Sequence, residues 1–218
     1  MSRSTATAAA ADVPAKFRAP GIERRKRLLA AARQLLGKHE LDEISLADVA
    51  RAARIPKGSA YHYYGDIMQL YVQLMAELGD EMLEDARRPI RIGAHADWTQ
   101  VVSALVRRGA QYFSRDRAAR QLIISMKTPP ELKMRDRQSD RRIAQLFEAH
   151  IERQFELPQR PERTAIFFRA IEIADLMFTL SMLQHGSITA EMTEEAIRAV
   201  TGYLRAHFPA TLRRRGQH

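Results

Sequence analysis

Residues 45–64 of the chain read SLADVARAARIPKGSAYHYY, a stretch that divides into two short helices with a tight turn between them. Ser45 and Asp48 have the spacing of a capping box, in which each side chain accepts a hydrogen bond from a backbone amide of the other residue. Pro56 suits the first turn of the second helix, where a missing N–H costs nothing. Apolar residues recur at helical spacing in the first helix: Leu46, Val49, Ala50 and Ala53.

The second helix has the composition of a surface that meets a large polar partner. Residues 57–64 are mostly basic, small, hydroxylated or aromatic. Small residues allow a close approach, and the others bond phosphates or base edges, as the recognition helix of a helix-turn-helix requires. The alternative is an ordinary helical hairpin whose aromatic side chains face the protein core, because a motif match is only a hypothesis.

Composition and charge narrow the class of protein. The chain has 218 residues, 45% of them hydrophobic, so it can bury a core as one large or two small domains. Lys and Arg number 35 against 26 acidic residues, and the net charge of +9 favours polyanions. Positive charge is densest in residues 1–70, with 12 basic and 7 acidic residues. Without cysteine, disulfides and thiolate metal sites are excluded. No apolar run reaches the length of a membrane span, and residues 1–20 lack the apolar region of a secretory signal, which predicts a cytoplasmic protein.

The remaining pattern predicts helices and no β-strand of useful length. Residues 1–20 are expected to form a disordered arm, and Arg213, Arg214 and Arg215 a solvated tail. The segment over 162–185 is apolar on more than one face, so it needs cover on both sides. Helices are expected at 22–38, 67–88, 98–114, 117–126, 131–155 and 162–185, followed by a last helix capped by Thr193.

Residues 21–74 resemble the N-terminal domain of the TetR family of bacterial transcriptional regulators. The resemblance is carried by Gly58, Ser59, Tyr61 and Tyr64, which match the family's recognition-helix signature. Arg54 stands where the family usually has glycine, so a left-handed backbone there is expected to be mildly strained.

The resemblance implies an all-α fold and a regulatory function. A three-helix head with the helix-turn-helix, residues 21–68, is expected to join through a long helix to a ligand-sensing and dimerisation domain, residues 69–210, with a basic tail at 211–218. The function implied is a repressor that binds a near-palindromic DNA operator as a homodimer and is released by a small-molecule effector. A ligand-independent or non-specific DNA-binding protein is the alternative, marked by steep salt dependence and no sequence preference.

No cofactor, metal or membrane partner is expected, and neither is enzymatic activity. The sequence has no phosphate-binding glycine motif, no metal-binding pair of histidines and no nucleophile elbow.

The resemblance and the side-chain chemistry together assign DNA-binding roles. Ser45, Tyr61 and Tyr63 are expected to contact mainly phosphates, which fix the register of the protein on DNA. Lys57 and Ser59 are the expected base readers, since Lys prefers guanine acceptors and Ser is permissive. The other members of the expected surface are His62, which suits either role, and Gly58, which allows close approach, whereas Tyr64 is expected to point inward.

Polar groups inside apolar helical stretches are candidates for the effector pocket: Tyr112, His150, Glu172 and Asp175. Glu172 and Asp175 are three residues apart, so both can point at a common partner. Each candidate also has a structural alternative, because buried polar groups are often structural. The carboxylates pair with Arg163, Arg169 or the other subunit in that alternative, and Tyr112 and His150 are satisfied core groups.

A second copy of the chain supplies the missing cover of the apolar helices most simply. The last two long helices are therefore expected to pair with their twins in a four-helix bundle, which is also the dimer mode of the resembled family. The expected interface residues are Phe167, Ile171, Phe178, Met182, Ile197 and Leu204.

Overall fold

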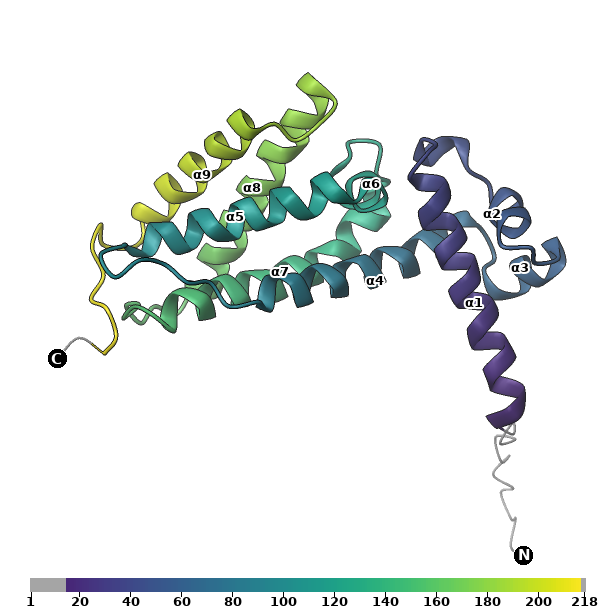
Figure 1. Cartoon of the computed structure of the whole chain (residues 1–218), viewed down its shortest axis with the longest axis horizontal. Helices are drawn as coiled ribbons and strands as arrows, with labels where there is room; N and C mark the ends of the chain where they lie inside the picture. The colour runs from purple at the N-terminus through teal and green to yellow at the C-terminus, as the bar shows by residue number, and fades with distance from the viewer. Residues whose placement is uncertain (1–14, 217–218) are drawn as a thin grey trace, which may run out of the picture.

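The computed structural model describes residues 15–216, with side chains described outside 15–20, 131 and 133–139. All its regular elements are helical, apart from one antiparallel bridge between Phe155 and Arg214. Figure 1 shows a small head, built from α1, α2 and α3, attached at one end of α4, and a larger body formed with the helices that follow. The all-α prediction is confirmed.

The head forms as the local sequence predicts. Ser45 caps α2 through a reciprocal capping box, in which the Asp48 N–H donates to the Ser45 hydroxyl at 3.2 Å and the Ser45 N–H donates to the Asp48 carboxylate at 3.1 Å. The first helix begins at Ala15 rather than Ile22, so residues 15–20 of the expected arm are helical, and residues 1–14 lie outside the described part. The head elements are α1 (Ala15–Leu36), η1 (Leu41–Glu43), α2 (Leu46–Ala52) and α3 (Lys57–Tyr63).

The body helices begin and end at identifiable caps. Asp66 caps the helix that begins at Ile67 by accepting from the Gln69 N–H at 2.8 Å. Gly186, with φ of 68°, ends the helix that begins at Arg163. Thr189, not Thr193, caps the last helix, since its hydroxyl accepts from the Met192 N–H at 3.1 Å. The body elements are α4 (Ile67–Arg87), α5 (Trp98–Arg115), α6 (Arg117–Ala119), the π-helical turn η2 (Arg120–Ile124), α7 (Pro130–Glu152), α8 (Arg163–His185) and α9 (Ala190–Arg205).

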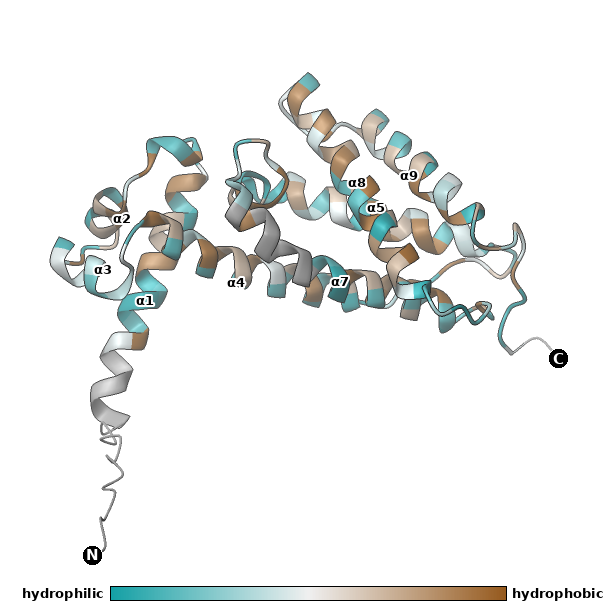
Figure 2. Ribbon diagram, turned by 180° about the vertical axis from the view of Figure 1, so that it is seen from behind, coloured by the Kyte–Doolittle hydropathy of each residue, from teal (hydrophilic) through white to brown (hydrophobic). Residues whose placement is uncertain are grey.

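One apolar core runs from the head into the body. In the body α8 packs against both α7 and α9, while α5 packs against α4, α7 and α9. Figure 2 shows hydrophobic residues on more than one side of α8. In the described part, no helix is both long and apolar enough to cross a membrane.

The expected solvated tail is wrong for the backbone and for one arginine. The Arg213 carbonyl accepts from the Glu156 N–H, and the Arg215 N–H donates to the Gln154 carbonyl, both at 2.9 Å. The Arg214 guanidinium lies 5.5 Å from the ring centroid of Phe155, a cation–π contact. Only the side chains of Arg213 and Arg215 are exposed, so the chain end closes one end of the body.

Candidate DNA-binding surface and ligand cavity

A tight turn fixes the angle between α2 and α3. The N–H groups of Ala53 and Ile55 donate to α2 carbonyls at 2.9 Å. Arg54 has φ of 53°, the left-handed conformation that its place in the turn predicted, at a typical cost of roughly 1–2 kcal/mol. Arg27 of α1 donates to the carbonyls of Ala53 and, at 3.3 Å, of Arg54. The sequence pattern did not reveal this clamp, since Arg27 is one of four consecutive basic residues.

The inner side of α3 packs into the head. Ala60 is completely buried, so its small side chain lets α3 approach the head core closely. Tyr64 is 4% exposed, and its hydroxyl donates to the Gln73 side chain of α4 at 2.8 Å. Burial raises the pKa of Tyr64 to about 12. The inward orientation predicted for Tyr64 is therefore confirmed, and it fastens α3 to α4.

The outer side of α3 presents the predicted contact residues. Lys57, Gly58, Tyr61 and His62 are exposed, while Ser59 and Tyr63 are half-buried. The Lys57 ammonium lies 5.7 Å from the Tyr61 ring centroid. A methyl group added at Gly58 would meet nothing within 4 Å, so the backbone there is open to a partner.

A residue of α1 flanks this surface in a way the sequence did not indicate. Arg25 of α1 lies 5.6 Å from the ring centroid of Tyr63, which adds a cation beside α3. The Ser45 hydroxyl donates to the Asp48 carboxylate, and this hydrogen bond lowers the pKa of the Asp48 carboxyl. A phosphate contact by Ser45 would therefore share a group that already caps α2, and its DNA-binding role stays a prediction.

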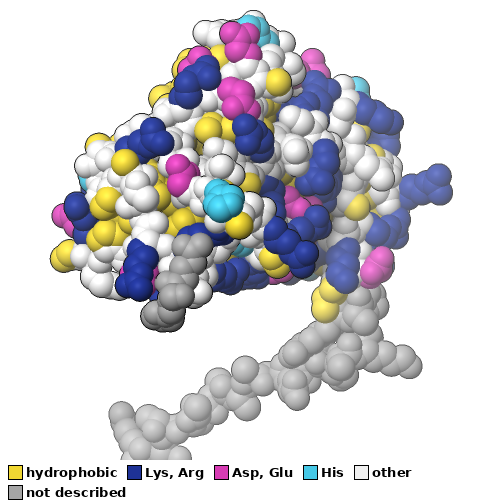
Figure 3. All heavy atoms as spheres, turned by 60° about the vertical axis from the view of Figure 1, so that its left-hand side comes forward, with side chains coloured by type: hydrophobic (Ala, Val, Ile, Leu, Met, Phe, Trp, Pro, Cys, Tyr) yellow, Lys and Arg dark blue, Asp and Glu magenta, His cyan; other side chains and the backbone are white. Residues whose placement is uncertain are grey.

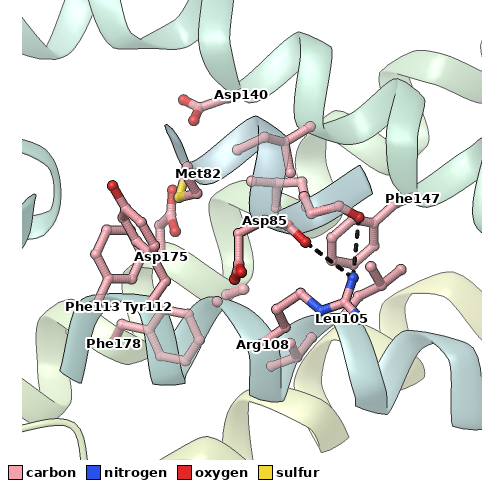
Figure 4. A pocket seen from close by; sticks show the side chains of 16 residues that line it. Met82, Asp85, Leu105, Arg108, Tyr112, Phe113, Asp140, Phe147, Asp175 and Phe178 are labelled. Carbon is pink, nitrogen blue, oxygen red and sulfur yellow. Dashed lines mark hydrogen bonds between the residues drawn. The ribbon is translucent and has the colours of Figure 1, made fainter. Parts of the chain in front are cut away.

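The body encloses a cavity among α4, α5, α7 and α8, shown in Figure 4. Its volume is about 50 Å³, enough for a few water molecules. Most of the lining is apolar and four members are aromatic, but three carboxylates and one guanidinium also face it. The lining includes Met82, Asp85, Arg108, Tyr112, Phe113, Asp140, Phe147, Asp175 and Phe178.

Two of the four predicted pocket residues line this cavity. Asp175 does, and so does Tyr112, whose hydroxyl donates to the Leu78 carbonyl at 2.8 Å and is thereby satisfied. His150 lies outside the lining, with its Nε2 atom 2.8 Å from the Ala86 carbonyl at the end of α4. Glu172 is half-buried on α8 and also outside the lining, so the two carboxylates do not share the cavity.

The structural alternative for Glu172 and Asp175 named Arg163 among their partners. Arg163, one of their expected partners, instead bonds Glu148 and Glu152 of α7, each at 2.6 Å. This pair of contacts ties the start of α8 to α7. Sequence spacing could not reveal it, because the residues lie on separate helices.

Comparison with known proteins agrees with this geometry. Residues 28–74 match the family model described as bacterial regulatory proteins, tetR family, and residues 96–208 match the tetracyclin repressor-like C-terminal domain. The chain belongs to the TetR family. It is therefore a DNA-binding transcriptional regulator, and this membership confirms that it is not an enzyme.

Solved structures share the fold at low sequence identity. A TetR-family regulator from Streptomyces coelicolor is 20% identical, with a TM-score of 0.64, covering 84% of this chain and 98% of its own. A TetR regulator from Rhodococcus sp. RHA1 is 19% identical, with a TM-score of 0.63 and coverage of 87% and 97%. Thermus thermophilus FadR, a TetR-family repressor in complex with lauroyl-CoA, is 19% identical, with a TM-score of 0.57 and coverage of 81% and 93%. No curated protein sequence matches the chain.

In this TetR-family chain, polar contacts join the head to the body beside the start of the π-helical turn. Arg33 of α1 bonds both carboxylate oxygens of Glu81 on α4, at 2.7 and 2.8 Å, and its Nε donates to Asp116 at 3.0 Å. Gln121 of η2 is 8% exposed and bonds three backbone groups between the end of α1 and η1. This junction could not be predicted from local sequence patterns, because its partners are more than 40 residues apart.

Most of the predicted dimer residues are buried within their own protomer. Phe167 and Leu204 are completely buried within the protomer, and Phe178, Ile171 and Ile197 are 2%, 6% and 8% exposed. Side chains covered by their own protomer offer little surface to a partner. Phe178 packs edge-on against Phe113, with 6.1 Å between ring centroids, and lines the cavity. Only Met182, which is half-buried, retains access to the outer surface.

The buried His150 predicts a pH dependence of stability. Burial lowers its pKa below the ordinary value of 6.5, and Arg153 and Arg108 add to this, whereas the bond to Ala86 opposes it. The unfolded chain therefore binds a proton below pH 6.5 that the folded chain resists, so the free energy of unfolding falls with falling pH.

His150→Gln, which keeps a donor for the Ala86 carbonyl, should show a smaller drop in melting temperature between about pH 7.5 and about pH 5.5 than the unaltered protein. The exposed His95 provides a control, and His95→Gln should leave the drop unchanged. Equal drops in all three proteins would contradict the role of His150.

Proposed function

We propose that this regulator is a cytoplasmic repressor that binds a near-palindromic operator as a homodimer and is released when a small molecule enters the body cavity. One observation carries the proposal: α4 supplies a wall of the cavity and also holds the head. Met82 and Asp85 line the cavity, while near the other end of α4 Gln73 bonds Tyr64 and Tyr71 donates to the Leu41 carbonyl at 3.2 Å. A displacement of α4 at the cavity therefore moves the recognition helix.

The size of the cavity supports such a displacement. Its volume of about 50 Å³ is far below the roughly 300–1,000 Å³ of ordinary ligand pockets. A ligand therefore has to separate the helices around the cavity, α4 among them. For release, the ligand must bind the displaced arrangement better than the DNA-bound one, and couplings of about 1–3 kcal/mol are typical of such linkage. The complex of Thermus thermophilus FadR with lauroyl-CoA supports a ligand-binding body in this fold.

The outer face of α8 supports the homodimer. Its outward residues recur at alternating steps of four and three, the spacing of a helix-packing seam. Leu176 and Leu183 are 57% and 59% exposed, two of the few large hydrophobic side chains so exposed in the described part. Figure 3 shows hydrophobic side chains gathered in patches among the charged ones. The proposed seam consists of Ile173, Leu176, Leu180 and Leu183, flanked by Arg169.

The outer face of α9 flanks this seam with mostly polar groups. Glu191, Arg198 and Arg205 are exposed there, while Ile197 and Leu204 face the protomer core. Gly202, between Arg198 and Arg205 in the sequence, is also exposed. A methyl group at this position would meet nothing within 4 Å, so another helix can approach closely.

Selection of bound sequences from random DNA by the purified protein tests the proposed operator. An inverted repeat is expected, because a two-fold dimer places two recognition helices in successive major grooves. Enrichment of no sequence, together with equally salt-sensitive binding to all DNA, would favour a non-specific DNA-binding protein instead.

Replacing Lys57 tests the recognition surface. Lys57→Ala is expected to lower operator affinity by about tenfold and to relax base preference at one position of each half-site, since a base contact contributes about 1–3 kcal/mol of discrimination. Lys38→Ala, an exposed substitution with the same change in net charge, should leave affinity nearly unchanged. Equal effects of the two substitutions would show that only net charge matters.

A further inference from the structure

The geometry points to an effector that is a small apolar cation, an amine or quaternary ammonium group carried on an aromatic or alkyl body. This inference rests on the proposed function, since it assigns the chemical class of the molecule that enters the body cavity.

Carboxylates from three helices meet at the cavity. Asp85 comes from α4, Asp140 from α7 and Asp175 from α8, and Figure 4 shows them around a common space. The Asp140 residue is 5% exposed and the Asp85 side chain 12% exposed. Charges so far from water interact strongly with any charge placed between them, because the local dielectric constant is low.

The guanidinium in the lining does not balance these carboxylates. Arg108 donates through one nitrogen to the carbonyls of Asp85 and Ala86, both at 3.2 Å, and of Arg88 at 2.7 Å. These carbonyls end α4, where the helix dipole is negative and attracts a cation. Arg108 therefore directs one of its nitrogens to the end of the helix, and an anionic ligand would meet three carboxylates in the lining against this one guanidinium.

The rest of the lining suits the body of such a ligand. Tyr112, Phe113, Phe147 and Phe178 contribute aromatic rings, and Met82 contributes a flexible thioether. Aromatic faces attract cations, best where water is excluded, and methionine adapts its shape to an apolar guest. A neutral ligand would use the rings but would leave the carboxylates with no gain.

A ligand cation that enters the cavity replaces existing partners of the carboxylates. Asp140 and Asp175 already interact with other groups of the protein. Asp85 pairs with Arg88 at 3.1 Å and with Arg115 at 3.5 Å, and both arginine side chains are largely exposed. Exposed arginines return to water at little cost, so a buried cation can replace them beside Asp85.

A surface groove of about 850 Å³ leads to the same carboxylate. It shares Asp85 and Tyr112 with the cavity. Its other acidic residues are Glu77, Asp80, Glu81 and Glu84, of which the last three pair with arginines. Burial and, next, the neighbouring Glu81 raise the pKa of the Glu77 carboxyl, whereas Arg33 and Lys26 oppose the shift. We expect cationic ligands to enter through this groove and to bind in the cavity.

Three probes of matched shape test the inference: 4-phenylbutylamine, 4-phenylbutanoate and 4-phenyl-1-butanol. Each is titrated into the full-length protein, first alone with the melting temperature as readout, then bound to a fluorescent operator with dissociation as readout. The amine should raise the melting temperature and release DNA at a concentration about tenfold lower than the alcohol, and the acid should do neither. An acid or alcohol as effective as the amine, or an amine that does not bind, would overturn the inference.

Two variants locate the effect. Asp175→Asn and Asp85→Asn should each weaken the response to the amine by about tenfold and leave the response to the alcohol unchanged. Glu156→Gln, an exposed change of the same charge remote from the cavity lining, serves as the control. A full amine response in both aspartate variants would refute the inference. Binding of the amine without release of DNA would instead contradict the proposed function and leave the ligand class standing.

Discussion

Leu176→Glu is expected to convert the regulator from a dimer into a monomer and to lower its operator affinity by a factor of about 100 or more. Leu176 lies in the middle of the proposed seam on α8, and 57% of its surface is exposed in the protomer. In the proposed dimer a carboxylate there would face the apolar side chains of the partner, at a desolvation cost of several kcal/mol. Loss of the dimer lowers operator affinity, because two linked heads bind far more tightly than one.

Sizing with light scattering at micromolar concentration measures the change in mass, and fluorescence anisotropy measures operator binding. The substitution leaves the protomer core intact, so helix content and cooperative melting should persist. Gln111→Glu, an exposed position on α5, adds the same charge away from the seam and should remain a dimer with full affinity. A Leu176→Glu protein with the mass of a dimer would place the interface elsewhere.

The sequence predicted the head well because its determinants are local. A capping box, a turn and a seven-residue helix depend on residues a few positions apart, so Ser45, Arg54 and Tyr64 were placed correctly. The left-handed conformation of Arg54 could be predicted from the turn and the family resemblance alone. The contact of Arg27 with this turn could not be predicted, because only the packing of α1 brings its guanidinium there.

The faces of α8 could not be predicted in the same way. An apolar period identifies which residues avoid water, but it does not say which neighbour covers them. Phe178 and Leu176 are two residues apart, about 200° around the helix, and the structure buries the first to 2% exposure and leaves the second at 57%. The predicted interface therefore contained mainly residues of the protomer core.

The cavity lining posed a related problem. Asp85 and Asp140 sit in strongly charged stretches, where the ordinary expectation is a solvated side chain. Their inward positions depend on how α4 and α7 cross, which no local pattern records. Asp175 was identified because it interrupts an apolar segment, although the same signal also selected Glu172, which lies outside the lining.

Gln121→Leu is expected to lower the melting temperature by roughly 10 °C. The Gln121 amide nitrogen donates to the carbonyls of Leu36 and His39 at 2.7 and 2.8 Å, and its oxygen accepts from the Leu41 N–H at 2.8 Å. Leucine has a similar size but bonds none of these groups. Each unpaired buried group costs about 1–3 kcal/mol, which makes about 3 kcal/mol for the three together a conservative value.

Gln100→Leu, an exposed substitution on α5, should leave the melting temperature within about 2 °C of the unaltered protein. Equal melting of the two variants would show that the Gln121 bonds contribute little. Gln121→Leu also separates ligand binding from the release of DNA, because Gln121 joins η2 of the body to the end of α1 in the head. The cavity lies outside this junction, so a ligand should still stabilise the Gln121→Leu body while releasing DNA less completely, since α4 and the ion pairs of Arg33, Arg117 and Lys127 then link the two parts without the Gln121 bonds.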